Sequence, residues 1–261
     1  MKRRMALVLA YDGTDFAGWQ RQTNALSIQQ VLEETIENLL HEPVHVTASG
    51  RTDAGVHAEG QVAALDLEHP IPAERLQAAL NSNLPASIRV MDCYEAAPDF
   101  QPRYDAKRKT YRYTVFNGEV MPPKYRFTAV REYRKIDWGK VEQCMELLIG
   151  EHDFAAFHST GSSEKTTTRI LYEAKSYADP KEPALRHMEF TGNGFLYNMV
   201  RILVGTLLDI GCGKRDPKDI ELAFQTGNRN LAGPTAPPQG LTLVQVEYEK
   251  NRINKEKTVD F

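Results

Sequence analysis

A tight loop at residues 49–58, with the sequence SGRTDAGVHA, brings an acid, a base and an imidazole close to two glycines. The side chains that could carry chemistry are Arg51, Asp53 and His57. Loops of this composition are most often solvated turns, because Asp and Gly both suit turn backbone conformations. A functional role for Asp53 therefore depends on what the rest of the chain supplies.

Arg201 lies in the stretch FLYNMVRILVGTLL, with apolar neighbours on nearly every side. A buried guanidinium loses several kcal/mol of hydration unless a carboxylate pairs with it. Asp209 follows eight positions later and cannot form a local i, i+4 pair, so a partner should come from elsewhere in the fold. Asp53 is a fitting candidate. The alternative is that Arg201 extends from the edge of its helix to solvent or to a helix C-terminus.

Basic side chains are clustered although the net charge is −3. The stretch QPRYDAKRKTYRY holds five of them against a single acid, Asp105, with tyrosines interleaved: Arg103, Lys107, Arg108, Lys109 and Arg112. A second basic run covers residues 124–135. Such mixtures suit phosphates and stacked bases, whereas the simpler interpretation is a solvated face on ordinary strands.

Tyr111 lies in a strand-like alternation just after the first basic run. From the residues alone, a core aromatic on the buried face of a sheet and a ring that stacks on a base are both open interpretations.

Length and composition exclude several classes of protein. The chain has 261 residues, of which 41% are hydrophobic and 26% charged, which is ordinary for a globular protein with its own core. Its three cysteines have no disulfide-framework or zinc spacing, so we expect no metal site and a reducing cytoplasm. The apolar stretches near residues 5–11 and 195–210 are too short or too polar to cross a bilayer, so no membrane role is expected.

In the first half of the chain, the sequence pattern predicts a clear order of strands and helices. We expect strands at 5–11, 44–48, 61–67 and 88–94, and helices at about 28–40 and 73–81. Ser27, with Gln30 three residues later, forms the capping-box pattern that begins the first helix. The order βαββαβ predicts a ferredoxin-like unit over residues 1–102 that carries the Asp53 loop.

The second half, residues 103–248, repeats this order less clearly. Strands are expected at 111–115, 170–177, 186–191 and 241–248, with helices after Asp137, from Phe195 towards Gly211, and after Pro217. The predicted fold class is thus α+β, with two ferredoxin-like halves whose antiparallel sheets lie side by side around a central active-site cleft. Residues 249–261 are expected to be a disordered tail.

Four motifs now stand in register along the chain: DGTDFAGWQ from Asp12, SGRTDAGVHA, KTYRY from Lys109, and GFLYNMVR ending at Arg201. In this order they resemble the motifs of the tRNA pseudouridine synthase A family, from about Met5 to Glu247. The family isomerises uridine to pseudouridine in the anticodon stem-loop of tRNA, at positions 38 to 40, as a homodimer and without a cofactor.

The resemblance implies roles for particular residues. Asp53 matches the catalytic aspartate, Tyr111 the aromatic residue against the target base, and Arg201 the basic partner of the aspartate. Arg51 resembles a residue that helps to displace the base, and His57 is interpreted as structural. Arg103, Lys107, Arg108 and Lys109, together with the run 124–135, would belong to the tRNA-binding surface.

The proposed chemistry suits these residue types. A carboxylate can attack the base or the ribose, or take a ribose proton, and a guanidinium nearby favours its ionised form. The target nucleotide must leave its stack, so recognition of a folded RNA by basic surfaces is expected. Two alternatives stay open: a non-catalytic RNA-binding protein on the same scaffold, and a glycoside hydrolase, for which the loop lacks a second acid.

Overall fold

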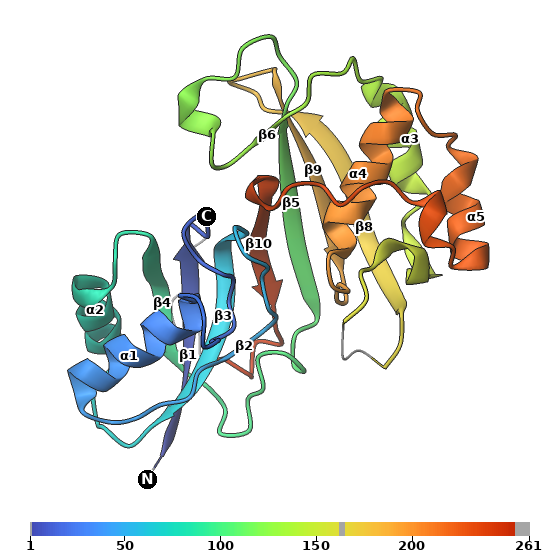
Figure 1. The fold of residues 1–261 in the computed structure, drawn as a ribbon. Coiled ribbons are helices and arrows are strands. Elements are labelled where there is room, and N and C mark those ends of the chain that lie inside the picture. The colour runs from blue at the N-terminus through green and yellow to red at the C-terminus, as the bar shows by residue number, and fades with distance from the viewer. Residues whose placement is uncertain (1, 162–164, 254–261) are drawn as a thin grey trace. The chain divides into compact units, whose positions relative to one another are not determined.

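The computed structural model describes residues 2–161 and 165–253. Two compact units are present: unit 1 comprises Met1–Lys107 and Leu243–Phe261, and unit 2 comprises Arg108–Thr242. Figure 1 labels the helices and strands of both units. Each unit has its own α+β architecture and is described separately below.

Unit 1 has the predicted βαββαβ order. Its elements are β1 (Arg3–Tyr11), α1 (Ile28–Leu40), β2 (Thr47–Ala48), β3 (His57–Leu67), α2 (Ala73–Asn83) and β4 (Ile88–Glu95). The strands lie in the order β4-β1-β3, and β1 is antiparallel to both neighbours. The short β2 pairs antiparallel with β3, and β10 (Leu241–Glu247) also lies next to β3. This is the ferredoxin-like arrangement that the sequence predicts for the first half.

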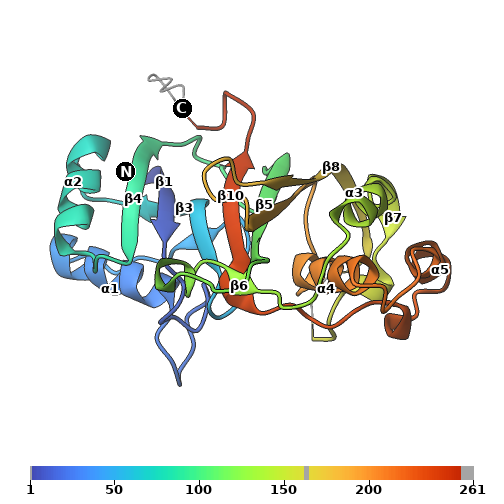
Figure 2. The same ribbon diagram turned by 90° about the horizontal axis from the view of Figure 1, so that it is seen from above.

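The helices of unit 1 pack beside each other on the sheet (Figure 2). Ser27 is the N-cap of α1, and its hydroxyl accepts from the Gln30 backbone N–H at 3.2 Å, as the capping pattern predicts. The Gln30 amide, however, donates to Glu34. Helix α1 buries Ile28, Leu32 and Ile36 completely, and each such side chain contributes about 2 kcal/mol of transfer free energy.

The main strands of unit 2 pair antiparallel in the order β5-β9-β8-β7. Its elements are β5 (Arg108–Phe116), β6 (Val130–Arg131), α3 (Trp138–Glu146), β7 (Gly150–Asp153), β8 (Thr168–Ala178), β9 (Leu185–Gly192), α4 (Met199–Gly211) and α5 (Lys218–Thr226). Along the chain, β5, β8 and β9 correspond to the first, second and third strands of the ferredoxin-like pattern. In that pattern the third strand lies between the first and the second, as β9 lies between β5 and β8. Strands β6 and β7 were not expected from the sequence, and they are only two and four residues long.

Helix α4 forms the core of unit 2, and all but one of its residues, Arg201, are buried. The helix begins at Met199, four residues after the expected start near Phe195. Asn198 has a left-handed backbone with φ of 60°, which a right-handed helix cannot include, so the helix cannot begin before it. It ends at Gly211, as expected, and Gly213 follows with φ of +77°. The segment 233–236 lies against α4, since the Gly233 N–H donates to Thr206 Oγ1 at 2.7 Å.

The division into units differs from the sequence-based one in two places. Most of β10 belongs to unit 1, although we expected this strand with the C-terminal half. Residues 249–253 also do not behave as the expected disordered tail: Ile253 is buried and bridges to Ala96, while Arg252 forms ion pairs with Asp99 and Asp105. Hydrophobic burial and these ion pairs hold the segment to unit 1. The rest of the predicted tail, 254–261, lies outside the described residues.

Over residues 2–161 and 165–253, no helix has the length and apolarity that a membrane crossing requires.

The contact between α4 and segment 233–236 gives a stability prediction. A Cβ at Gly205 would fall far inside van der Waals contact with the backbone carbonyl of Pro234, which cannot rotate away as a side chain does. We expect Gly205→Ala to lower the free energy of unfolding by at least about 3 kcal/mol. Gly139→Ala in α3 is the control, because its Cβ would meet only Asp137 Oδ1 at 3.4 Å, and alanine favours the helix. Urea denaturation of both variants checks this, and equal stabilities would contradict it.

Candidate active site

The SGRTDAGVHA loop joins β2 to β3 in unit 1, and backbone hydrogen bonds hold it against residues 12–19. The Trp19 N–H donates to the Thr52 carbonyl at 3.0 Å, and the Gly55 N–H donates to the Phe16 carbonyl at 3.3 Å. Within the loop, the Val56 N–H donates to the Asp53 carbonyl at 3.1 Å and closes a turn around Asp53. The first two sequence motifs therefore form one structural element.

Two glycines in the first motif allow this close approach. A Cβ at Gly18 would lie 2.6 Å from the Thr52 carbonyl oxygen, and Gly18 also has φ of +90°, which side chains rarely adopt. A Cβ at Gly13 would clash with the backbone of Val56 even more severely. Both glycines are thus required by the position of the loop that carries Asp53.

A buried polar network lies beneath the loop. The Tyr11 hydroxyl hydrogen-bonds to Thr52 Oγ1 at 2.8 Å, and Gln61 Nε2 donates to the Gly50 carbonyl at 2.9 Å. Ser49 Oγ donates to Gln61 Oε1 at 2.6 Å. Burial raises the pKa of Tyr11 to about 12, although its bonds to Thr52 and Gln61 partly oppose this, so the phenol stays neutral. The network ties the loop to β1 and β3.

His57 is buried at the start of β3 and contacts the first motif. The Gly13 N–H donates to its Nδ1 at 3.1 Å, and Asp12 Oδ1 lies 3.2 Å from the same nitrogen. Burial raises the pKa of Asp12, but hydrogen bonds from Thr14 and the neighbouring His57 outweigh it and leave that pKa below its usual value. We interpret His57 as a residue that positions the loop, in agreement with the structural role expected for it.

The loop presents its two candidate catalytic side chains differently. Asp53 is half-buried, whereas Arg51 is exposed. A carboxylate at a half-buried position on a fixed backbone has a defined location and can still be reached by a substrate. This arrangement suits a nucleophile or general base.

Tyr111 lies in β5 of unit 2, opposite Phe190 of β9, and only 8% of it is exposed. Its ring meets Phe195 edge to face, with centroids 5.0 Å apart and planes at 80°. Phe195 belongs to the same motif as Arg201, so the third and fourth motifs also meet within unit 2. The packing agrees with a core aromatic, and the base-contacting role remains a prediction.

Arg201, in the first turn of α4, is oriented by groups of unit 2. Its Nε donates to the Ala236 carbonyl at 2.7 Å and one terminal nitrogen donates to Asn198 Oδ1 at 2.8 Å. Asn198 in turn donates to Ser159 Oγ at 3.0 Å. The guanidinium is therefore held by two elements, and it is neither fully buried nor fully exposed. Asp53 belongs to unit 1, and its pairing with Arg201 stays a prediction.

Asp209, which the spacing excludes as a local partner of Arg201, has partners of its own. It is 1% exposed and forms ion pairs with Arg134 at 2.7 Å and Lys214 at 3.3 Å. Arg134 also pairs with Glu132 at 2.7 Å. One member of the second basic run thus has a structural role beside any role in RNA binding.

The remaining basic candidates have varied surroundings. Lys107 pairs with Glu249 at 2.9 Å in unit 1, and the Arg108 guanidinium lies 4.7 Å from the Tyr172 ring centroid in unit 2. Arg103 lies 5.8 Å from the ring centroid of Tyr104, a side chain that is 79% exposed. Lys109 is half-buried at the second position of β5.

In the run 124–135, cations lie over aromatic rings. Lys124 is 4.6 Å from the Tyr125 centroid, Arg126 is 4.0 Å from that of Phe127, and Arg131 is 4.3 Å from that of Tyr133. Phe127 and Tyr133 are both exposed. Exposed rings beside cations offer both stacking and charge to a single-stranded or looped RNA.

Sequence reasoning missed two sets of positioning residues. The first is the polar network of Tyr11, Thr52 and Gln61, because hydrogen bonds across strands leave no local pattern. The second is segment 234–237, which contacts Arg201 through Ala236 and accepts from the Tyr113 hydroxyl at Pro237, 2.8 Å away. The signals that could have pointed to it are Gly205 within the apolar helix and the Pro-rich run GPTAPP.

Comparisons with known proteins agree with this arrangement. The sequence model of the family described as "tRNA pseudouridine synthase" matches residues 7–105 and 144–249. The tRNA pseudouridine synthase A of Geobacter sulfurreducens is 44% identical over 246 residues, which cover 94% of this chain and 100% of the relative. The corresponding proteins of Caldicellulosiruptor bescii and Desulfotalea psychrophila are 43% and 40% identical, again with 94% and 100% coverage.

The chain is thus an isomerase of α+β fold, and it belongs to the tRNA pseudouridine synthase family. The matched segments include Arg51, Asp53, Arg103 and Arg201. Tyr111 and the run 124–135 lie in the interval that the family model leaves out.

The buried network under the loop gives the second prediction. Tyr11→Phe removes one hydroxyl and leaves the Thr52 hydroxyl without this partner, so we expect a loss of about 1–3 kcal/mol in unfolding free energy. Because Thr52 precedes Asp53, kcat should fall more than affinity for the substrate. Tyr104→Phe is the control, since its side chain is exposed. Thermal unfolding and steady-state kinetics test both effects, and unchanged values for Tyr11→Phe would refute them.

Proposed function

We propose that this chain isomerises uridine to pseudouridine in the anticodon stem-loop of tRNA, at positions 38 to 40. Its family membership supports the reaction. The observation that supports the proposal most is the fixed loop of unit 1, which holds Asp53 half-buried. The resemblance matches Asp53 to the family's aspartate. The positions 38 to 40 rest on the resemblance alone.

The reaction changes connectivity and leaves the composition of the nucleotide unchanged. The bond between N1 of uracil and C1′ of ribose breaks, the base turns, and C5 forms a new bond to C1′. The hydrogen on C5 is then lost to solvent, and N1 gains a proton. The Asp53 carboxylate would act as a nucleophile on the base or the ribose, or as the base that takes a ribose proton.

Three other residues receive roles from the resemblance and from their surroundings. Arg201 is proposed as the cation that favours ionised Asp53, and Asn198 and Ala236 orient its guanidinium. Tyr111 is proposed to contact the extruded uracil, and Phe195 supports its ring from the edge. Arg51 is exposed beside Asp53, where it could take the place of the displaced base in the RNA stack.

Basic side chains of both runs are proposed to bind the tRNA backbone. Arg103, Lys107, Arg108 and Lys109 represent the first run, and the cation–aromatic pairs of residues 124–133 represent the second. Neutralising phosphates releases counterions, so binding should weaken steeply as salt rises.

We also propose, from the family resemblance, that the protein is cytoplasmic and acts as a homodimer. Light scattering of the purified protein tests the dimer. A monomer at micromolar concentration that is fully active would contradict it.

Release of tritium from tRNA labelled at uridine C5 tests the reaction and the role of Asp53. The wild type should release tritium, because forming pseudouridine displaces the C5 hydrogen, and Asp53→Asn should fall to background while tRNA binding is kept. Asp66→Asn is a matched control, since Asp66 lies on β3 and its carboxylate pairs with Arg4 on the neighbouring strand. It should retain activity.

Two results would refute the assignment. Wild-type protein that binds tRNA without releasing tritium from any uridine at 38 to 40 would leave the non-catalytic RNA-binding protein as the better interpretation. Asp53→Asn protein that still releases tritium would end the catalytic role of Asp53.

Tyr111 gives a further prediction. Tyr111→Phe keeps the ring and its packing on Phe195, so it should retain far more turnover than Tyr111→Ala, whose loss should exceed the roughly 1–3 kcal/mol of one stacking contact. Melting temperatures must be measured in parallel. A Tyr111→Ala protein that unfolds while Tyr111→Phe is fully active would favour the core-aromatic interpretation.

A further inference from the structure

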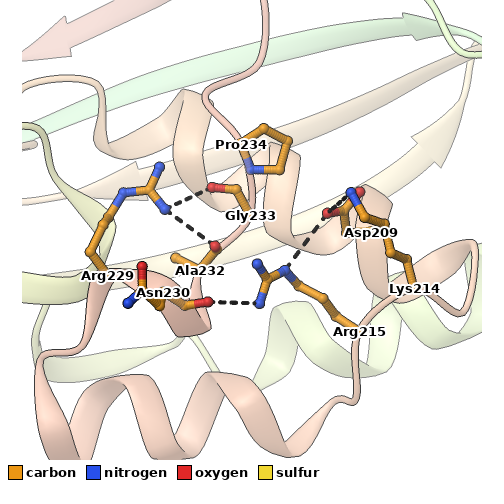
Figure 3. Close-up of a pocket in the computed structure, with 8 residues that line it drawn as sticks. All are labelled: Asp209, Lys214, Arg215, Arg229, Asn230, Ala232, Gly233 and Pro234. Carbon is orange, nitrogen blue, oxygen red and sulfur yellow. Dashed lines mark hydrogen bonds and ion pairs between the residues drawn. The ribbon is translucent and has the colours of Figure 1, made fainter.

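A cavity of about 560 Å³ in unit 2 has no role in the reaction described above. It lies beside the C-terminal end of α4, the segment that leads to α5, and the segment after α5 (Figure 3). Its lining consists of Asp209, Lys214, Arg215, Arg229, Asn230, Ala232, Gly233 and Pro234.

Positive charge dominates this lining. Three cations, Lys214, Arg215 and Arg229, face one carboxylate, Asp209, which already pairs with Arg134 outside the cavity. Lys214 and Arg215 approach the same oxygen of Asp209, at 3.3 and 3.7 Å. Arg215 also lies 3.7 Å from the carboxylate of Asp219 on α5. Two carboxylates thus face three cations, and the cluster keeps a net positive charge that attracts anions.

Backbone carbonyls hold both arginines in place, in addition to the carboxylates near Arg215. A terminal nitrogen of Arg215 donates to the carbonyls of Asn230 and Leu231, and one of Arg229 donates to those of Ala232 and Gly233. Carbonyl oxygens orient a guanidinium without cancelling its charge. Burial and the nearby charge of Arg215 hold the pKa of Arg229 below its usual value, as expected when two like charges lie close together.

We propose that this cavity binds a phosphate group of the RNA backbone, and the proposal rests on tRNA being the substrate. Positioned guanidinium groups match the oxygens of a phosphate, and an ammonium adds a point charge. The cavity is also open to solvent and has no aromatic side chain in its described lining. It therefore suits a phosphodiester whose sugar and base stay outside, and it offers no surface for a nucleobase to stack on.

Lys214 separates this proposal from a purely structural role of the cluster. Cations close to the C-terminus of α4 are favourable in any protein, and both arginines also tie segment 229–233 in place. The Lys214 side chain, by contrast, is 66% exposed and its one described contact is with Asp209. Its ammonium lies at the surface, where an anion can approach it, and Asp209 keeps Arg134 and Arg215 as partners when Lys214 is replaced.

The test is filter binding of unmodified tRNA over a range of KCl concentrations. Lys214→Gln should weaken binding and make the slope of log affinity against log salt less steep by about one, while Lys214→Arg keeps the wild-type slope. Lys140→Gln is the matched control, because Lys140 is 55% exposed and pairs with one carboxylate, that of Asp137 at the N-cap of α3. It should bind like the wild type.

A second measurement uses the unaltered protein. Bound tRNA should protect Lys214 from acetylation by an amine-reactive probe, read by mass spectrometry, and should leave Lys140 reactive. Unchanged binding and slope in folded Lys214→Gln, or equal acetylation of Lys214 with and without tRNA, would overturn the proposal. Should Lys214→Gln fail to fold, the acetylation result decides.

Two further arms separate the alternatives. Inorganic phosphate that raises the melting temperature of the wild type but not of Lys214→Gln, with tRNA binding equal in both, would identify a free-anion site and overturn the RNA assignment. Tritium release is measured separately. Wild-type protein that binds tRNA with the expected Lys214 dependence yet releases no tritium would support this cavity while refuting the proposed reaction.

Discussion

The close approach of two backbone segments is the constraint on which the candidate active site depends. Residues 12–19 lie so near to residues 52–56 that neither Gly13 nor Gly18 has room for a side chain. Main-chain hydrogen bonds from Trp19 and Gly55 close the contact. A catalytic carboxylate must be held to within a fraction of an ångström, and this close backbone contact limits how far the loop can move.

Beneath that contact, the buried polar network connects the loop to strands β1 and β3 by hydrogen bonds. Buried hydroxyl and amide groups are costly when unsatisfied, so Tyr11, Thr52 and Gln61 stabilise the loop only while all of them are paired. The same dependence makes them sensitive to mutation. Stability of unit 1 and placement of Asp53 are consequently linked, and a mutation under the loop should alter both.

Local signals explain what the sequence could predict. The Ser27 cap, the alternating strands and the glycines after α4 depend on neighbouring residues only, and the structure bears them out. The late start of α4 at Asn198, the membership of β10 in unit 1 and the packing of residues 249–253 depend on contacts between residues far apart in sequence. No window of sequence contains both partners of such contacts. The motifs pointed to Asp53 and Arg201, and the fourth motif also contains Asn198, which orients Arg201. Ala236 and the network of Tyr11 and Gln61 lie outside the motifs.

Helix α4 carries both Arg201 and Asp209, so it connects the proposed catalytic arginine to the basic cavity of unit 2. Arg201 lies in its first turn and Asp209 in its last, about 12 Å apart along the axis at 1.5 Å per residue. The segment 229–236 contacts α4 directly at two places, where Ala236 accepts from Arg201 and Gly233 donates to Thr206. Its link to Asp209 runs through Arg215, which pairs with Asp209 and donates to the carbonyls of Asn230 and Leu231. Gly205, midway along the helix, permits the segment to lie directly on α4. Segment 229–236 therefore both lines the cavity and orients Arg201 through Ala236. A phosphate bound at the cavity would contact the same segment that positions the proposed catalytic arginine.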